Sequence, residues 1–210
     1  MTPDSAAGPA DSLSLVDLRV TPLQRRYHCA NDKPQMPALN PPIHPAVIRP
    51  NLRFMLSHPA HVVALGFGSG LAPVAPGTAG TLWAWVAWLV LARWLSPIEL
   101  AALIAASLVI GWWACTVTAA HMRVLDPGNI VWDEIVAFWI VLWLLLPAGF
   151  GAQLVAFALF RFFDAVKPGP VAWADNLFHG FGWKGGFGIL LDDLVAALCA
   201  LLVIAAWRVL

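Results

Sequence analysis

Five long apolar runs follow one another from residue 82 to the end of the chain, separated by short breaks at proline, glycine or charged residues. None of them alternates apolar and polar residues as a half-buried strand does. Several are shorter than the roughly 20 residues that cross a bilayer. The pattern predicts an all-α membrane bundle of about four to five apolar helices. The predicted helices are Leu82–Leu95, Pro97 to about Ala120, Trp132–Leu146, Gln153 to about Val166, and Ile189–Leu210.

The first 55 residues have a different character. Nine of the seventeen prolines fall within residues 1–50, and no periodic apolar face is present. Such a segment buries too little apolar surface to offset the entropy lost on ordering. We therefore expect residues 1–55 to form a disordered, proline-rich N-terminal tail and residues 56–210 to form the membrane-embedded domain.

Composition supports the membrane assignment and excludes some functions. The chain is 60% hydrophobic and only 11% charged, with a mean hydropathy of +0.75, whereas soluble domains are about 25% charged. Twelve tryptophans against one tyrosine suit the interface between headgroups and tails. A formal net charge of zero gives no sign of nucleic-acid binding, and the three cysteines have neither disulfide nor metal-site spacing.

Carboxylates stand at the ends of three apolar runs. Asp133 and Glu134 begin one run, Asp164 ends another beside Arg161, and Asp192 with Asp193 interrupts the start of the last. If five helices cross in alternation, all these positions fall on one side of the membrane. That side also carries most of the basic residues, so the positive-inside rule makes it cytoplasmic. The pattern predicts one polar site at the cytoplasmic face.

The residue types at this predicted site indicate its chemistry. The carboxylates Asp133, Glu134, Asp164, Asp192 and Asp193 would repel one another at a low-dielectric edge unless a cation joined them. Oxygen ligands of this kind suit Mg²⁺, and Arg161 with Lys167 would neutralise a transferring phosphoryl group. A simple ion pair of Arg161 with Asp164, three residues apart, is the structural alternative. No Gly-x-Ser-x-Gly nucleophile motif is present, which leaves metal-assisted attack, favouring water as the nucleophile.

Glycine-rich segments precede the first apolar run. His61–Leu71 contains Gly66, Gly68, Ser69 and Gly70, and the stretch Pro76–Thr81 reads Pro-Gly-Thr-Ala-Gly-Thr. Glycine permits close backbone approach, Thr78 or Thr81 could cap the following helix, and free N–H groups at a helix start bind phosphate. We expect phosphate contacts from Gly68, Ser69, Gly70, Gly77 and Thr78. His179, in the polar loop 167–188, is a further candidate, although a hydrogen-bonded loop histidine is its plainer role.

Taken together, these motifs resemble the phosphatidylglycerophosphatase A family of bacterial membrane phospholipid phosphatases. The matching pieces occur in family order over about residues 56–210: Gly66–Leu71, Pro76–Thr81, Val131–Glu134, Phe160–Asp164 with Lys167-Pro168, His179-Gly180, and Gly188–Asp193. The resemblance implies a mostly helical, Mg²⁺-dependent enzyme of the inner membrane that hydrolyses phosphatidylglycerophosphate to phosphatidylglycerol and phosphate. The tail of about 55 residues and the residues Phe181–Gly185 are additions to the family pattern.

Two other functions remain open at the level of sequence. A small carrier could bind a translocated cation through intramembrane carboxylates, although its charges would lie near helix centres and no internal repeat is present. A lipid phosphotransferase also uses aspartates at the membrane edge, but its spaced Asp-Gly, Ala-Arg, Gly, Asp and Asp helix pattern is missing from this chain. No protein partner is predicted.

Overall fold

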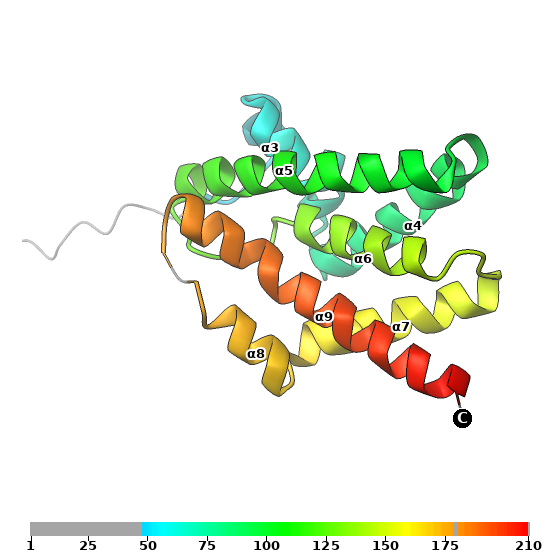
Figure 1. The fold of residues 1–210 in the computed structure, drawn as a ribbon. Helices are drawn as coiled ribbons and strands as arrows, with labels where there is room; N and C mark the ends of the chain where they lie inside the picture. Colours follow the sequence, from blue (N-terminus) through cyan, green and yellow to red (C-terminus); the bar gives the residue numbers. More distant parts are fainter. Residues whose placement is uncertain (1–47, 179, 210) are drawn as a thin grey trace, which may run out of the picture. The chain divides into compact units, whose positions relative to one another are not determined.

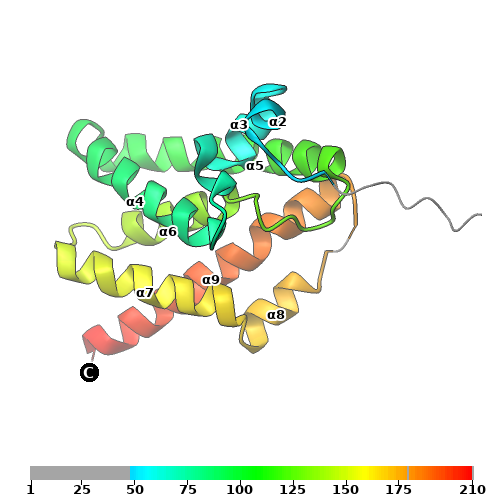
Figure 2. The same cartoon turned by 180° about the vertical axis from the view of Figure 1, so that it is seen from behind.

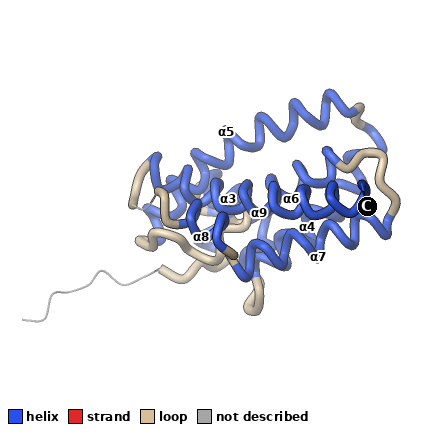
Figure 3. Tube along the Cα trace, turned by 60° about the horizontal axis from the view of Figure 1, so that its bottom comes forward, coloured by secondary structure: helices blue, strands red, loops and turns tan. Residues whose placement is uncertain are grey.

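The computed structural model describes residues 48–178 and 180–209, so most of the predicted tail lies outside the described residues. The described part is all-α, as the sequence predicts, with no strand in it (Figure 3). Its elements are α2 (Leu52–Leu56), α3 (Pro59–Ala64), the 3₁₀ helix η1 (Gly66–Leu71), α4 (Pro76–Trp94), α5 (Pro97–Met122), α6 (Trp132–Leu144), α7 (Phe150–Val166), α8 (Gly169–Asp175) and α9 (Trp183–Val209).

Helix α6 lies at the centre of the bundle. It has 13 residues and is apolar on almost every side, as expected of a helix with no solvent-facing stripe. It packs against α4, α5, α7 and α9, with Phe138 fully buried between Trp85, Phe157 and Phe160. Its first turn carries Asp133 and Glu134, so the core of the bundle fixes the acidic pair.

The other long helices surround α6 and bring their polar ends together. Helix α5 runs along one edge, with α6 between it and α7, while α9 runs obliquely from the end of α5 across α7 in both Figure 1 and Figure 2. The end of α5 and the start of α9 lie at the left of Figure 1, with α8 below them and the start of α6 further inward. The five predicted helices therefore exist, and their directions place the charged motifs at one end.

Two helices begin six residues earlier than the apolar pattern predicts, and α7 begins at Phe150, three residues before the predicted Gln153. Helix α4 starts at Pro76 instead of Leu82, and α9 starts at Trp183 instead of Ile189. Glycine is a poor helix former, so these glycine-rich segments read as loops in the sequence. These segments are helical all the same, because close packing requires glycine at these positions. A Cβ on Gly186 would collide with Thr116 of α5, and one on Gly188 with the Phe178 carbonyl.

The start of α4 is also not capped as predicted. Its N-cap is Ala75, in the left-handed region at φ 48°, and no side chain caps the helix. Pro76 occupies the first turn, where its missing N–H costs no hydrogen bond. Thr81 instead donates its hydroxyl to the Gly77 carbonyl at 2.9 Å. The prediction that Thr78 or Thr81 caps this helix was wrong.

Two helices, α5 and α9, are long and apolar enough to cross a membrane. Only 33% of the apolar window of α5 and 39% of that of α9 are buried, unlike the core helix of a soluble protein. At 13 and 17 residues, α6 and α7 are shorter than the roughly 20 residues of a full span. The structure thus supports two candidate spans, and the crossing of four to five helices stays a prediction.

Helices α2 and α3 form a short pair that the sequence did not predict, and α2 overlaps the last residues of the expected tail. The pair packs on α5 through His61, of which only 2% is exposed. Its Nε2 lies 2.8 Å from Nδ1 of His121, and its Nδ1 lies 2.9 Å from the Phe54 carbonyl. Since a carbonyl only accepts, Nδ1 of His61 carries the proton and Nε2 accepts from His121.

This contact should make the α2–α3 pair sensitive to pH. Burial lowers the pKa of His61 below its ordinary 6.5, and His121 and His58 lower it further, against the opposing hydrogen bond to Phe54. A lowered folded-state pKa means that the stability is present above pH 6.5 and is lost as the pH falls through the folded value. Hydrogen exchange, corrected for its intrinsic rate, should show α2–α3 losing protection relative to α6 between pH 7.5 and 5.5.

The matched control for this prediction is His61→Phe, which places an apolar ring at the position of the imidazole and cannot titrate. Its α2–α3 amides should exchange alike at both pH values. Equal protection of α2–α3 in the unsubstituted protein at pH 7.5 and 5.5 would contradict the prediction.

Candidate active site

Arg161 joins three helices at the polar end. From α7 its Nη1 donates to Oε1 of Glu134 on α6 at 3.0 Å, to Asp164 one turn along α7, and to the Thr81 hydroxyl of α4 at 3.4 Å. The side chains of Arg161, Glu134 and Asp164 are 19%, 13% and 11% exposed. The pairing of Arg161 with Asp164 is therefore real, but it is part of a larger arrangement that also holds Glu134.

Lys167 makes a second such junction. It ends α7 in the left-handed conformation, at φ 45°, which turns the chain into α8. Its Nζ lies 2.7 Å from both Asp175 Oδ1 of α8 and Asp192 Oδ2 of α9. Burial alone would lower the pKa of Lys167, but the two hydrogen-bonded carboxylates outweigh it and raise that pKa above its ordinary value. Lys167 therefore stays charged.

Asp192 and Asp193 lie in the third turn of α9, not in the first as the sequence predicts, because the helix starts six residues before Ile189. They are 7% and 3% exposed. Successive helical residues point about 100° apart. Asp192 thus meets Lys167, while Asp193 lies within electrostatic reach of Asp133, Asp164 and Glu134. The five predicted carboxylates come together around α6 and α9.

Three carboxylate oxygens of this group are buried without a hydrogen-bond partner: Oε2 of Glu134, Oδ1 of Asp192 and Oδ2 of Asp193. Asp133 uses one oxygen to accept from the Glu134 backbone N–H at 3.0 Å. A buried ionised oxygen without a partner is costly. Two cationic side chains, Arg161 and Lys167, pair here with acidic groups that outnumber them. The site is therefore short of positive charge.

These donors fit a divalent cation of the Mg²⁺ type, which takes carboxylate oxygens and water. In the described residues, no three His, Cys, Asp or Glu side chains are arranged to hold a metal ion. The orphaned oxygens of Glu134, Asp192 and Asp193 are buried, hard ligands without a hydrogen-bond partner. The donor set thus matches the predicted metal in its chemistry.

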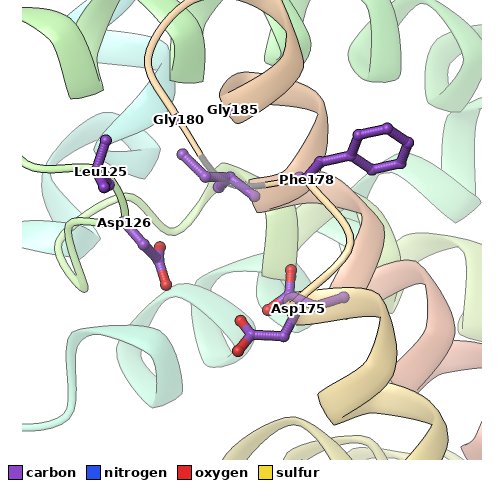
Figure 4. Close-up of a pocket in the computed structure, with 9 residues that line it drawn as sticks. Leu125, Asp126, Asp175, Phe178, Gly180 and Gly185 are labelled. Carbon is purple, nitrogen blue, oxygen red and sulfur yellow. The ribbon is translucent and has the colours of Figure 1, made fainter.

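A small cavity opens beside Asp192 (Figure 4). It has a volume of about 110 Å³ and lies between the loop after α5, the end of α8 and the start of α9. Figure 4 shows the carboxylates of Asp126 and Asp175 approaching it from different sides. This space admits several water molecules but not a whole phospholipid. It suits a hydrated ion or a phosphate group.

Asp126 and Asp175 were not among the predicted site residues. In the sequence, each lies in a polar segment that follows a predicted helix and looks like an ordinary loop carboxylate. The sequence does place both residues on the predicted side that also holds Lys167 and Asp192. It does not predict α8, the helix that brings Asp175 onto Lys167.

The predicted glycine segments lie against the acidic end. A Cβ on Gly77 would run into the Glu134 carboxylate, and one on Gly80 into Val131 and Glu134. Thr78 is partly exposed in the same first turn of α4. These glycines therefore leave room for Glu134.

The second glycine segment, η1, packs just before the acidic pair. Gly68 adopts φ +106°, the Ser69 hydroxyl donates to the Gly66 carbonyl at 2.8 Å, and Gly70 is buried against the Asn129 backbone. Phosphate binding by Gly68, Ser69, Gly70, Gly77 and Thr78 stays a prediction. His179 lies outside the described residues, so its expected role stays a prediction as well.

Fold and site together define a helical, membrane-type protein with an acidic centre suited to phosphate-ester chemistry. Residues 62–208 match the family model described as phosphatidylglycerophosphatase A. The chain is 40% identical over 157 residues to phosphatidylglycerophosphatase A of Haemophilus influenzae, covering 75% of this chain and 93% of that protein. It is 40% identical over 145 residues to phosphatidylglycerophosphatase A of Escherichia coli, covering 69% and 80%. The chain belongs to the phosphatidylglycerophosphatase A family.

Family membership confirms the predicted activity. The protein is a lipid phosphomonoesterase that dephosphorylates phosphatidylglycerophosphate to phosphatidylglycerol. Family membership therefore excludes the two alternative functions that the sequence left open, the cation carrier and the lipid phosphotransferase. No solved structure matches the chain.

Proposed function

We propose that the acidic end of the bundle carries out this hydrolysis with the help of Mg²⁺, at the cytoplasmic face of the bacterial inner membrane. The proposal rests on one observation: three buried carboxylate oxygens lack partners beside Arg161 and Lys167. Phosphate chemistry needs a positively charged site. Here the protein supplies two cations together with the ligands for a third.

Each group has a proposed task. Asp133, Glu134, Asp164, Asp192 and Asp193 hold the metal directly or through water, and when bound the metal lowers the pKa of water and stabilises phosphate charge. Arg161 and Lys167 contact the phosphate oxygens, where Arg161 can offer two N–H groups at once. A carboxylate outside the metal shell takes the proton of the attacking water. The water oxygen bonds to phosphorus while the bond from phosphorus to the terminal glycerol oxygen breaks. That oxygen takes up the proton held by the carboxylate, which gives phosphatidylglycerol and inorganic phosphate.

The ion pairs suggest how the site changes when substrate binds. Arg161 is held by Glu134 and Asp164, and Lys167 by Asp175 and Asp192. An incoming phosphate competes for the same N–H groups, and charge-assisted hydrogen bonds of this type are strong. Each carboxylate released by the phosphate becomes free to bind the cation. Substrate and metal should therefore bind cooperatively.

Phosphate release from the purified protein tests this proposal. In detergent with phosphatidylglycerophosphate, we expect release that stops on chelation of divalent ions and returns with Mg²⁺. The apparent affinity for Mg²⁺ should rise with substrate concentration. Undiminished release after exhaustive chelation would overturn the metal assignment and leave the phosphatase activity standing.

The orientation in the membrane is a separate proposal. If the helices cross in alternation, Arg49, Arg53, Arg123, Lys167 and Lys184 fall on the same side as the acidic site, and basic residues favour the cytoplasmic side. Gly128 lies in the connection before α6 and Gly151 in the first turn of α7. Alternating helices would place these two positions on opposite sides, and a Cβ at either position meets open space. In a variant without native cysteines, a membrane-impermeant maleimide added to intact cells should label Gly151→Cys and spare Gly128→Cys. The reverse pattern would invert the orientation.

A further inference from the structure

A second hollow, lined almost entirely by carbon, adjoins the acidic site. Its volume is about 500 Å³, and Phe67 of η1, one stripe of α4, two residues of α5, and Trp132 and Trp139 of α6 line it. Binding sites for small molecules usually measure about 300–1,000 Å³. We call it the tryptophan groove.

The tryptophan groove runs along the helices, away from the carboxylates. On α4 its lining residues Trp83, Ala87 and Val90 follow a single face, with spacings of four and three residues. On α6, Trp132 and Trp139 are two turns apart, about 10 Å along the helix. The groove therefore extends as an elongated channel parallel to the bundle.

One end of the groove lies on the same stretches of α4 and α6 as polar groups of the active site. Trp132 directly precedes Asp133, and Trp83 lies two residues after Thr81, whose hydroxyl contacts Arg161. Neighbouring positions near the starts of α4 and α6 thus carry polar groups of the active site on one side and groove residues on the other. A molecule with a phosphate at the carboxylates and an apolar tail can occupy both.

The indole N–H groups of the groove are satisfied within the protein. Trp132 donates to the Ser107 carbonyl of α5 at 3.0 Å, and Trp139 donates to the Ala84 carbonyl of α4 at 2.9 Å. These bonds fix both rings. They also leave ring carbon, with no free donor, as the surface that faces the groove, so the groove favours hydrocarbon.

Phe67 covers the end of the groove nearest the active site. Its backbone is left-handed, at φ 53°, although it is not glycine, and its side chain is 54% exposed. The ring stacks on Trp83 with centroids 5.4 Å apart and meets Trp132 edge-on at 5.9 Å. Strained backbone of this kind persists where its surroundings hold it, commonly at ligand sites. An exposed aromatic ring held by strain at this point suits contact with a ligand.

We propose that the tryptophan groove binds one acyl chain of the lipid substrate while its phosphate lies at the carboxylates. This inference rests on the proposed function. Spread over about 10 Å of length, the volume of about 500 Å³ gives a cross-section of roughly 50 Å². An α-helix about 10–12 Å across is too wide for that space, whereas a hydrocarbon chain fits. The occupant is therefore a chain of the substrate and not a helix of a second copy.

The first test fills the groove. Ala87→Phe and, at an exposed position further along, Val90→Phe should raise KM for diacyl phosphatidylglycerophosphate by about tenfold or more, because several buried methylenes lose their contacts. Turnover of the deacylated substrate, glycerophosphoglycerophosphate, should stay within about twofold of normal, as expected for a lost tail contact. Ala158→Phe, on an exposed face of α7 away from the groove, is the matched control and should change neither value.

These outcomes separate the two proposals. If the unsubstituted protein releases phosphate from neither substrate, the proposed function fails. If it hydrolyses both and the groove variants treat them alike, only the groove assignment fails. Loss of activity on the deacylated substrate in both groove variants would show damage to the site itself and would also count against the assignment.

A second test reads binding directly. Full-length protein in nanodiscs is irradiated with phosphatidylglycerophosphate that carries a diazirine in one acyl chain. We expect cross-links at groove residues of α4 and α6, removed by excess unlabelled phosphatidylglycerophosphate but not by phosphatidylcholine. Labels spread evenly over the exposed faces of α5, α7 and α9, with equal competition by both lipids, would mean ordinary bilayer contact and would overturn the inference.

Discussion

Phosphate release by an Asp192→Asn variant is expected to fall by considerably more than 100-fold, while Asp175→Asn should lose about tenfold or less. Both carboxylates accept from Lys167 Nζ at 2.7 Å, so each variant removes the negative charge from one of two matched partners of Lys167. They differ in burial, since Asp192 keeps an orphaned oxygen in the core and the side chain of Asp175 is 34% exposed. Loss of an outer partner of a metal site costs about 10–100-fold, and loss of a direct ligand costs more.

The comparison distinguishes metal binding from pairing with Lys167. Equal losses in the two variants would mean that both aspartates act only by holding Lys167. Asp133→Asn and Glu134→Gln extend the series and should sort into direct and indirect ligands by their Mg²⁺ dependence. Near-normal turnover in Asp133→Asn, Glu134→Gln and Asp192→Asn together, with unchanged metal dependence, would end the proposal that these carboxylates form the site.

The second large effect is expected from a single methyl group. In Gly77→Ala the new Cβ collides with the Glu134 carboxylate, whose side chain is enclosed between α4, α6 and Arg161. Glu134 must move, and a displacement of about 1 Å at a catalytic group can cost about 100-fold in rate. We expect turnover to fall by about that factor while the helical content measured by circular dichroism is kept.

Gly151→Ala is the matched control for Gly77→Ala. Gly151 also lies in the first turn of a helix, but a Cβ there meets open space, so activity should be unchanged. If Gly77→Ala retained full turnover, activity would not depend on where the Glu134 carboxylate lies. That result would contradict its role as a metal ligand.

The helices could be predicted where local signals and packing agree. Pro97 opens α5 as expected, and in the structure Ser96 and Glu99 form a reciprocal cap at the start of this helix. The prediction was wrong where glycine is kept for close packing, because the sequence does not show which neighbour approaches it. Gly186 against Thr116 and Gly77 against Glu134 are contacts between distant segments.

The site residues also divide into those with a local signal in the sequence and those that depend on contacts between distant segments. Adjacent carboxylates in apolar runs, such as Asp192 with Asp193, stand out in the sequence because they have no packing benefit there. Asp175 did not stand out, since a loop carboxylate is common and its pairing with Lys167 depends on α8. The His61–His121 contact was likewise hidden, because it joins residues 60 positions apart.

The shortness of α6 sets the depth of the acidic pair within the bundle. Its 13 residues give a length of about 20 Å, whereas the 26 residues of α5 and the 27 of α9 each give about 40 Å. In Figure 1 the start of α6 lies inward of the end of α5 and of the start of α9. Asp133 and Glu134, in the first turn of α6, are therefore recessed between longer helices, where a bound phosphate would be shielded from bulk water.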